Sequence, residues 1–422
     1  MVARTEPNSF GNSTVGTLSP EDSERVRSLG FSPRLFERVI ACLDTWVKEG
    51  KIPGVQLGIA RRNQPAWYYQ VGFANLESKQ AFTPDTFLRL ASASKPIVAL
   101  AFLRLMERGA CQLHDPVSKY CQEIRRMRVF KGVDAGQPVF MPLEEEMTLA
   151  HLLTHTSGLG YDFNVPRVLK ASYQTARPFA DDATMDDLLK YLVSLPLVFS
   201  PGKGFQYGLS TDLLGCVLER IAKQPLSELL HELVFAPLGM HRTGFGLPRD
   251  TAAQLAPLYK LVGKSHFVRA DRGDASRYVG QSKIFLGGSG LISTATDFMR
   301  FAEVLNNDGV AQGQRLIRAE GLRLMTSNQL DPGYLPFSVG PGMHYDTEGY
   351  GFGLNLKVLT HPRTKDYLAA EGEFGWAGAT NTYFWVDPRH ELAVLVFCQF
   401  VPFAPFALEQ EFKKVFYDAL LV

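Results

Sequence analysis

Two serines in this 422-residue chain are followed by a lysine three residues later, a spacing that can support nucleophilic catalysis. They are Ser92, in the tetrapeptide SASK, and Ser200, in the tetrapeptide SPGK. In a helix, a residue three positions on lies one turn away on the same side. A lysine kept neutral by burial there could accept the serine proton and turn the hydroxyl into a nucleophile. Chance alone produces about one such pair in a chain of this size, so the neighbouring residues must decide.

The residues that follow each serine distinguish the two candidates. Pro201 and Gly202 signal a turn after Ser200, so the lysine of that motif need not share a face with the serine. Ser92 precedes an apolar helical pattern, and Pro96 is tolerated only in the first turn of a helix. Ser92 is therefore expected at a helix N-terminus, where free N–H groups and the helix dipole favour the negative charge of an attacked carbonyl. The plain alternative is a serine that caps a helix, beside a surface lysine.

Five further motifs follow SASKPIVALAFLRLMERG in a fixed order along the chain. They are HLLTHTSGLGY, SPGKGFQYGLSTDLLG, GGSGL, YGFGL and GWAGATNTYFWVDP. With these motifs the chain resembles the serine β-lactamase and penicillin-binding superfamily over about residues 50–400. The resemblance is closest to the family VIII carboxylesterases, followed by the related fungal acyltransferases that load a side chain onto statin precursors. It implies a β-lactamase-like α+β fold and no cofactor.

The resemblance assigns three catalytic roles. Ser92 matches the nucleophile of the family's SxxK motif, and Lys95 matches its proton carrier. Tyr207 matches the tyrosine that shuttles the proton between nucleophile, lysine and leaving group. A phenol can do this where a nearby ammonium stabilises its anion. The plain alternative for Tyr207 is an aromatic side chain in a glycine-rich turn.

The third family motif matches Trp376, Ala377 and Gly378, which are therefore expected to bind substrate. By this match the N–H groups of Ser92 and Ala379 form an oxyanion hole, and Gly378 lets substrate approach the strand backbone. An indole cannot pair with a carboxylate as the lysine of β-lactamases does. Trp376 therefore favours uncharged esters.

A second departure from the β-lactamase pattern points the same way. The second motif reads Tyr207, Gly208, Leu209, so the asparagine that grips an amide side chain in β-lactamases is absent. The sequence thus predicts a serine carboxylesterase that forms an acyl-enzyme on Ser92 from a small-molecule ester or acyl donor. The alternatives are an acyltransferase that passes the acyl group to a small-molecule alcohol, a weak β-lactamase or DD-peptidase, and a non-catalytic binding protein of the penicillin-binding type.

Hydrophobic patterns indicate how the chain positions these residues. Hairpins are predicted near both ends, VQLGIA with WYYQVGFA and TYFWV with LAVLVF, whereas the middle of the chain is mostly helical. We therefore expect an antiparallel sheet built from both termini and flanked by helices, with a mainly helical domain inserted. The expected boundaries are a loose arm at 1–24, a sheet domain at 25–95 and 280–422, and a helical domain at 96–279, with the active site in the cleft between them.

Two long stretches, 162–182 and 327–347, carry Gly and Pro and are either site walls or surface insertions. His155 is expected to anchor a turn by a hydrogen bond rather than act as a base. The glycines of GGSGL are expected to let a turn pack near the sheet.

Composition narrows the class of partner. The chain has 44 Lys and Arg against 43 Asp and Glu, a net charge of +1, which gives no field to attract nucleic acid or acidic lipid. Neither its five cysteines nor its nine histidines show metal-ligand spacing, so no metal is expected. No apolar run is long enough for a signal peptide or a membrane span, which predicts a cytoplasmic protein without membrane association. The oligomeric state is left open.

Overall fold

The computed structural model describes residues 17–62, 64–175, 183–271, 277–280, 283–362 and 369–421. Its centre is a seven-stranded sheet in the order β11-β12-β13-β14-β15-β1-β2, and every neighbouring pair in it is antiparallel. The strands are β1 (Gly54–Arg61), β2 (Trp67–Gly72), β11 (Tyr350–Phe352), β12 (Lys357–Leu359), β13 (Phe374–Gly378), β14 (Thr382–Asp387) and β15 (Leu392–Phe397).

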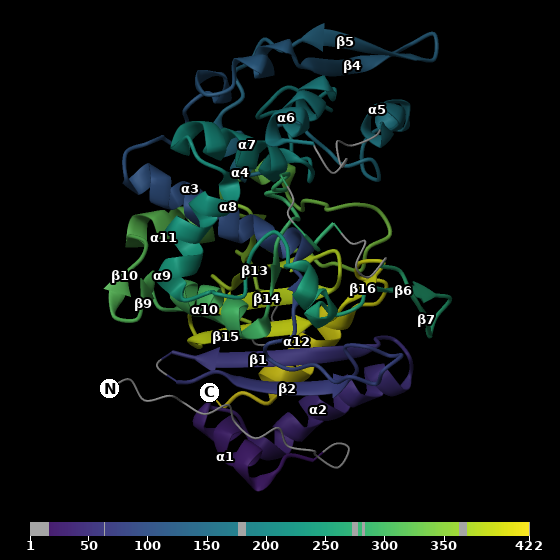
Figure 1. Ribbon diagram of the computed structural model, residues 1–422, viewed down its shortest axis with the longest axis vertical. Coiled ribbons are helices and arrows are strands. Elements are labelled where there is room, and N and C mark those ends of the chain that lie inside the picture. Colours follow the sequence, from purple (N-terminus) through teal and green to yellow (C-terminus); the bar gives the residue numbers. More distant parts are fainter. Residues whose placement is uncertain are drawn as a thin grey trace.

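Both ends of the chain build this sheet, as the two hairpin patterns predicted. β1 pairs with its hairpin partner β2 on one side and with β15, from the C-terminal hairpin, on the other. In Figure 1 the purple β1 and β2 lie directly below the yellow β15, β14 and β13. The expected α+β architecture, with an antiparallel sheet built from both ends of the chain and flanked by helices, is therefore confirmed.

Helices cover both faces of the sheet, and β14 and β15 are therefore buried along their whole length. On one face, α2 (Pro33–Lys48) and α12 (Leu408–Asp418) contact the sheet through ring pairs such as Trp385 with Phe416, whose centroids are 5.8 Å apart. On the other face, Phe298 of α10 (Ala295–Asn306) lies 5.0 Å from Phe384. Neighbouring residues of one strand thus point to opposite helical layers, as the strand period of two requires.

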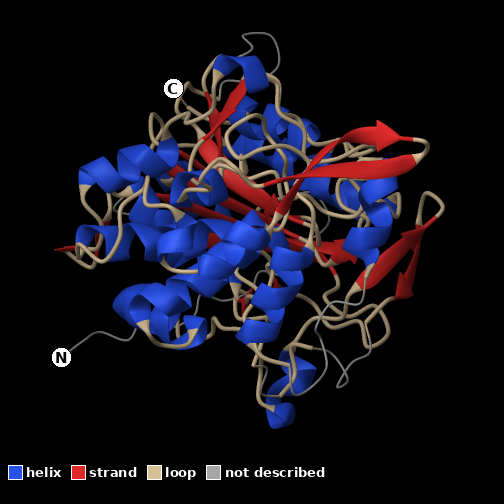
Figure 2. Ribbon diagram, turned by 90° about the horizontal axis from the view of Figure 1, so that it is seen from above, coloured by secondary structure: helices blue, strands red, loops and turns tan. Residues whose placement is uncertain are grey.

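Along the chain, most of the remaining elements come between β2 and β11. Figure 2, which views the molecule from above, shows the helices in blue. The helices are α3 (Ser94–Glu107), α4 (Leu149–Leu153), α5 (Lys170–Gln174), α6 (Met185–Ser194), α7 (Ser210–Ala222), α8 (Leu226–Leu230), a π-helical turn (His231–Phe235), α9 (Ala236–Leu238) and α11 (Ala319–Thr326). The short strands are β3 (Leu88–Arg89), β4 (Arg128–Asp134), β5 (Gln137–Pro142), β6 (Tyr259–Val262), β7 (His266–Arg269), β8 (Ile292–Ser293), β9 (Val310–Ala311), β10 (Gln314–Arg315) and β16 (Phe400–Val401).

The region expected to be helical also contains strands that its patterns did not predict. The β4–β5 hairpin projects at the top of Figure 1, and most of its residues are exposed or half-buried. Such a hairpin has no buried face to impose a clear alternation of apolar and polar residues. The sequence 259–269 forms β6 and β7, which extend a small sheet with β16 from the C-terminal part.

The prediction of a loose arm over 1–24 is wrong for its last part, because α1 begins at Pro20 and runs to Ser28. Ser19 caps this helix by accepting a hydrogen bond from the N–H of Asp22, and Val26 is fully buried. A serine cap followed by proline and acidic residues is a helix start. Residues 1–16 lie outside the described part of the chain.

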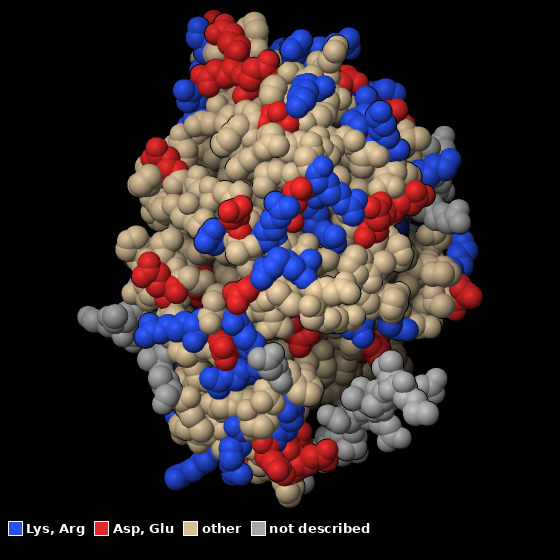
Figure 3. Space-filling view, turned by 90° about the vertical axis from the view of Figure 1, so that its left-hand side faces the viewer, with Lys and Arg blue, Asp and Glu red and all other residues tan. Residues whose placement is uncertain are grey.

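The surface carries charge of both signs. On the side of the molecule that lies at the left of Figure 1, Lys and Arg side chains alternate with Asp and Glu side chains (Figure 3). Within the described residues, no helix is both long enough and apolar enough to cross a bilayer.

Candidate active site

Ser92 lies where Pro96 predicted it, at the start of a helix. It occupies a 3₁₀ turn, Ala91–Ala93, that leads directly into α3, and Pro96 is the third residue of that helix. Ala91 adopts a left-handed conformation with φ of 46°, which residues other than glycine rarely adopt. This bend leaves Ser92 half-buried in the wall of a cavity with a volume of about 550 Å³.

Ser200 is placed differently and is not among the residues that line this cavity. The N–H of Lys203 donates to the carbonyl of Ser200 at 3.0 Å, which closes the turn that Pro201 and Gly202 predicted. The Lys203 ammonium lies 3.3 Å from Glu145, and both side chains are exposed. The second Ser-Lys pair is therefore a surface turn.

Lys95 is fully buried and has an acceptor for each of its three N–H donors. Its Nζ lies 2.8 Å from the carbonyl oxygen of Gly288, 3.1 Å from the hydroxyl of Tyr161 and 3.3 Å from Oγ of Ser92. It also lies 4.9 Å from the ring centroid of Tyr207, a cation–π distance. All of these contacts suit an ammonium ion.

The expectation of a neutral Lys95 is corrected by these surroundings. Burial by itself lowers the pKa of Lys95, but Tyr161, Tyr207 and the carboxylate of Asp212 outweigh burial and raise it above the usual value for lysine. The three acceptors within 3.3 Å of Nζ and the raised pKa both favour the ammonium form of Lys95. A protonated lysine cannot accept the serine proton, but it can stabilise the anion of a neighbouring phenol.

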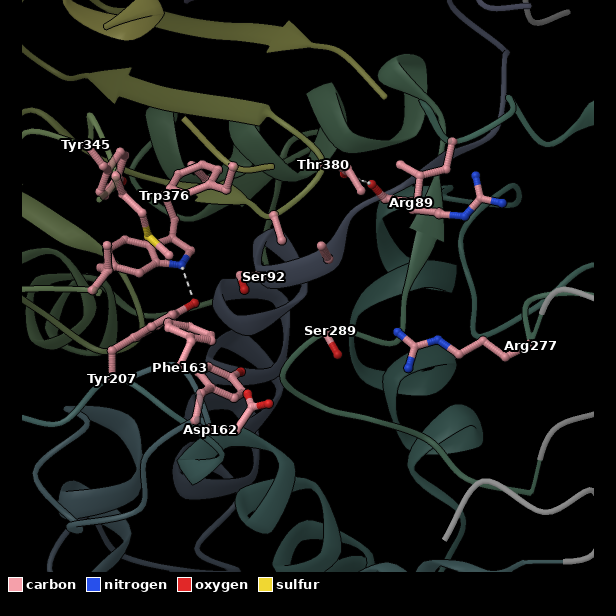
Figure 4. A pocket seen from close by; sticks show the side chains of 18 of the residues that line it. Arg89, Ser92, Asp162, Phe163, Tyr207, Arg277, Ser289, Tyr345, Trp376 and Thr380 are labelled. Atoms are coloured by element: carbon pink, nitrogen blue, oxygen red, sulfur yellow. Dashed lines mark hydrogen bonds between the residues drawn. The ribbon is translucent and has the colours of Figure 1, made fainter. Parts of the chain in front are cut away.

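Tyr207 lies beside Ser92 and is held by the indole of Trp376. Nε1 of Trp376 donates a hydrogen bond to the hydroxyl oxygen of Tyr207 at 3.3 Å. Figure 4 shows this bond as a dashed line, with the hydroxyl of Tyr207 pointing toward Ser92. This bond holds the phenol of Tyr207 at the cavity wall. Trp376 thus lines the cavity and also contacts the hydroxyl of Tyr207 directly.

Tyr161 is a site residue to which the sequence assigned no role. It ends the motif HLLTHTSGLGY, and its hydroxyl accepts one of the three hydrogen bonds of Lys95. Its ring lies edge-on to that of Tyr207, with centroids 5.6 Å apart. Burial raises the pKa of Tyr161 despite the opposing effect of Lys95, so this phenol is neutral at physiological pH. The conspicuous motif was the available signal, but only folding shows that its last residue reaches Lys95.

His155 anchors a turn, as expected. Its Nδ1 accepts a hydrogen bond from the N–H of Gly208 at 3.3 Å, which fixes the segment that carries Tyr207. Burial, and then the charge of Lys95, hold the pKa of His155 well below its usual range. A neutral, buried imidazole that already uses its lone pair in this way is a structural group.

The end of β13 and the residues that follow it line the same cavity as Ser92. Ala377 and Ala379 line the cavity together with Trp376, and no turn hydrogen bond of the described chain uses the N–H of Ala379. Thr380 donates to the carbonyl of Arg89 at 2.9 Å, and Thr382 donates to that of Leu90 at 3.2 Å. These bonds fasten the β13–β14 turn to the segment that leads into Ser92.

Gly378 has a different role from the one expected. It does not line the cavity, and a Cβ atom at this position would lie 2.1 Å from the carbonyl oxygen of Leu90. The glycine therefore lets two segments of backbone pack together rather than letting substrate approach. The glycines of GGSGL are corrected similarly: a Cβ at Gly287 would lie 2.5 Å from the carbonyl oxygen of Thr211, so this turn packs on α7 and not on the sheet.

Both long stretches contribute walls to the cavity. Asp162 and Phe163 come from the first, and Val339, Met343 and Tyr345 come from the second. The first stretch is not one continuous loop, because it contains a 3₁₀ turn (Arg167–Leu169) and α5, while its residues 176–182 lie outside the described chain. In Figure 4 the labelled aromatic residues Phe163, Tyr207, Tyr345 and Trp376 lie on one side of Ser92, and Arg89 and Arg277 lie on the other.

This sheet with its helical layers, and a serine and a buried lysine at the start of one helix, define the β-lactamase-like class. A family model named Beta-lactamase matches residues 36–414, and the chain belongs to this family. It is an enzyme of the β-lactamase-like serine hydrolase superfamily.

The relatives include an esterase, a hydrolase and a synthase. The esterase EstB of Burkholderia gladioli is 32% identical over 391 residues, which cover 86% of this chain and 90% of the relative. The structure of EstCE1, a hydrolase with promiscuous acyltransferase activity, matches with a TM-score of 0.75 and 25% identity, over 92% of this chain and 98% of the relative. The LovD6 mutant of simvastatin synthase from Aspergillus terreus matches with a TM-score of 0.77 and 25% identity, over 91% and 97%.

The packing of Gly378 leads to a stability prediction. Gly378→Ala should destabilise the fold by about 1–3 kcal/mol, because the added methyl group collides with rigid backbone. Gly244→Ala is the matched control, since a Cβ atom there meets no other atom within 4 Å, and it should change stability by less than about 1 kcal/mol. Urea unfolding measures both. Equal midpoints for Gly378→Ala and the parent protein would contradict the packing described.

Proposed function

We propose that this protein is a serine carboxylesterase that cleaves short, uncharged esters through an acyl-enzyme on Ser92. The observation that carries the proposal is the position of Lys95, whose buried ammonium touches Ser92 Oγ, while Tyr207 stands beside both at the cavity wall. A nucleophile, a charge and a phenol in contact can perform acyl transfer without a histidine base.

The proton moves between Ser92 and Tyr207. In the proposed reaction the phenolate of Tyr207 accepts the proton of Ser92 as Oγ attacks the ester carbonyl. The phenol then gives this proton to the leaving alkoxide as the ester C–O bond breaks. Water repeats the sequence against the acyl-enzyme, and the proton returns to Ser92. Lys95 keeps its protons throughout and stabilises the phenolate, while Tyr161 helps to hold Lys95 in place.

The negative charge that develops on the attacked carbonyl oxygen requires hydrogen-bond donors in the cavity wall. The N–H groups of Ser92 and Ala379 are the proposed oxyanion hole, because both residues line the cavity. The bonds of Thr380 and Thr382 to the segment before Ser92 support this assignment, since they set the separation between the two elements.

The proposed substrate class follows from the cavity walls. Trp376 is the residue that stands in the place of a carboxylate-binding lysine, and its N–H is engaged by Tyr207. Leu209 is buried and does not line the cavity, so it offers no polar group to an amide. An ester of a small apolar acid fits the aromatic side of the cavity better than an anionic β-lactam does, and Arg89 on the polar side is already paired with Asp271 at 3.0 Å.

Acyl transfer to an alcohol is the second candidate function. The cavity continues past Ser92 to a polar side formed by Arg89, Arg277 and Tyr278, which offers space for an acceptor other than water. The acyl-enzyme would be the same, and the two functions differ only in which hydroxyl reaches it. The acyltransferase activity of EstCE1 supports this candidate.

The nucleophile is tested by comparing the two serines of the SxxK pattern. Ser92→Ala should lower kcat/KM for p-nitrophenyl butyrate by about a thousandfold or more, because the variant lacks the hydroxyl group that is bonded to Lys95. Ser200→Ala is the matched control and should retain most of the activity, since that serine belongs to a surface turn. Similar activity in both variants would refute the assignment.

Substrate preference is tested with an ester and a β-lactam on the same preparation. One lost charge-assisted hydrogen bond is worth about 1.5–3 kcal/mol, or roughly ten- to a hundredfold in kcat/KM. Two such bonds are absent here, so kcat/KM for nitrocefin should fall far below that for p-nitrophenyl butyrate. Nitrocefin turnover equal to or faster than ester turnover would overturn the argument from Trp376 and Leu209.

A further inference from the structure

A buried carboxylate stands directly behind Lys95. Asp212 lies in the first turn of α7 and is only 1% exposed. Its Oδ1 accepts a hydrogen bond from the N–H of Gly288 at 3.0 Å, and the carbonyl of that same residue accepts the 2.8 Å bond from Lys95. Gly288 thus links a buried anion to the buried cation of the site through its two backbone groups.

The fit between these groups is close. A Cβ atom on residue 288 would lie 2.6 Å from Oδ2 of Asp212, so only glycine allows the backbone to approach the carboxylate this closely. The first turn of a helix stabilises an anion through its free N–H groups and its dipole. A buried charge without a compensating charge is strongly destabilising, so each of these two ions stabilises the other.

We propose that Asp212 is a positioning residue for the function proposed above: through Gly288 it holds Lys95 in place as an ammonium ion. The serine proton must then move to a tyrosine oxygen, because the lysine has no free lone pair. The titratable groups around Lys95 are Tyr161, Tyr207, Asp212 and the neutral His155. Asp212 is the one carboxylate among them, and it contributes to the raised pKa of Lys95.

A thermodynamic cycle tests the coupling without requiring any activity. Asp212→Asn and Lys95→Gln each leave one buried charge alone, whereas the double variant leaves neither. Urea midpoints should therefore show that the double variant loses clearly less stability than the sum of the two single losses. Strictly additive losses would overturn the proposal.

A matched control uses another buried aspartate. Asp297 is 2% exposed, lies in the first turn of α10 and accepts the N–H of Arg242. It is not among the groups that act on the charge of Lys95. Asp297→Asn combined with Lys95→Gln should give additive losses, so coupling of equal size in this pair would remove the specific role of Asp212.

The pH profile of ester hydrolysis provides the catalytic readout. Asp212 raises the pKa of both Lys95 and Tyr161, so its loss must lower the pKa values of the ammonium–phenol group. The kcat/KM profile of Asp212→Asn should therefore move to lower pH relative to that of the parent protein. A profile that changes only in height, or that moves to higher pH, would show a merely structural role.

Two further outcomes are distinguishable. If Asp212→Asn does not fold alone, recovery of folded protein in Asp212→Asn/Lys95→Gln supports the charge pairing, and failure to recover overturns it. If the parent protein forms no acyl-enzyme on Ser92, the proposed function fails, but the unfolding cycle still decides whether Asp212 balances Lys95.

Discussion

Burial of one ammonium ion is the constraint on which this site depends. Lys95 has no solvent around it, so the chain itself must supply three hydrogen-bond acceptors and a compensating negative charge. Those groups come from the nucleophile turn, from the segment after α4, from the glycine-rich turn near residue 288 and from the first turn of α7. The cation therefore determines how four separate segments pack around the start of α3, and it places a phenol beside Ser92.

The sheet determines the other half of the site. Its central strands are buried between two helical layers, which makes β13 a rigid support for the residues that follow it. Gly378 packs on the backbone of Leu90, and Thr380 and Thr382 bind to the same segment, so the two proposed oxyanion donors are held at a fixed separation. Trp376 links the two halves, because it belongs to β13 and donates a hydrogen bond to Tyr207.

Local signals predicted what depends on local structure. Pro96 located the start of α3, and the spacing and order of the motifs indicated the family and its fold. The charge of Lys95 and the part played by Tyr161 could not be predicted, because they depend on contacts across 66 and 193 residues of sequence. Burial alone suggested a neutral amine, and only the neighbours brought in by folding reverse that result. The β4–β5 hairpin was missed because its exposed strands show no apolar periodicity. Helix α1 was missed because its composition is mostly polar.

Intact-protein mass spectrometry after a brief incubation and an acid quench tests the central claim most directly. A panel of short p-nitrophenyl esters and acyl thioesters would serve as acyl donors, and peptide mapping would locate any adduct. The account predicts one added acyl group on the peptide that contains Ser92, and none on Ser92→Ala. An acyl group on another residue, or turnover of an ester with no adduct under any quench condition, would contradict a mechanism in which Lys95 and a tyrosine activate Ser92.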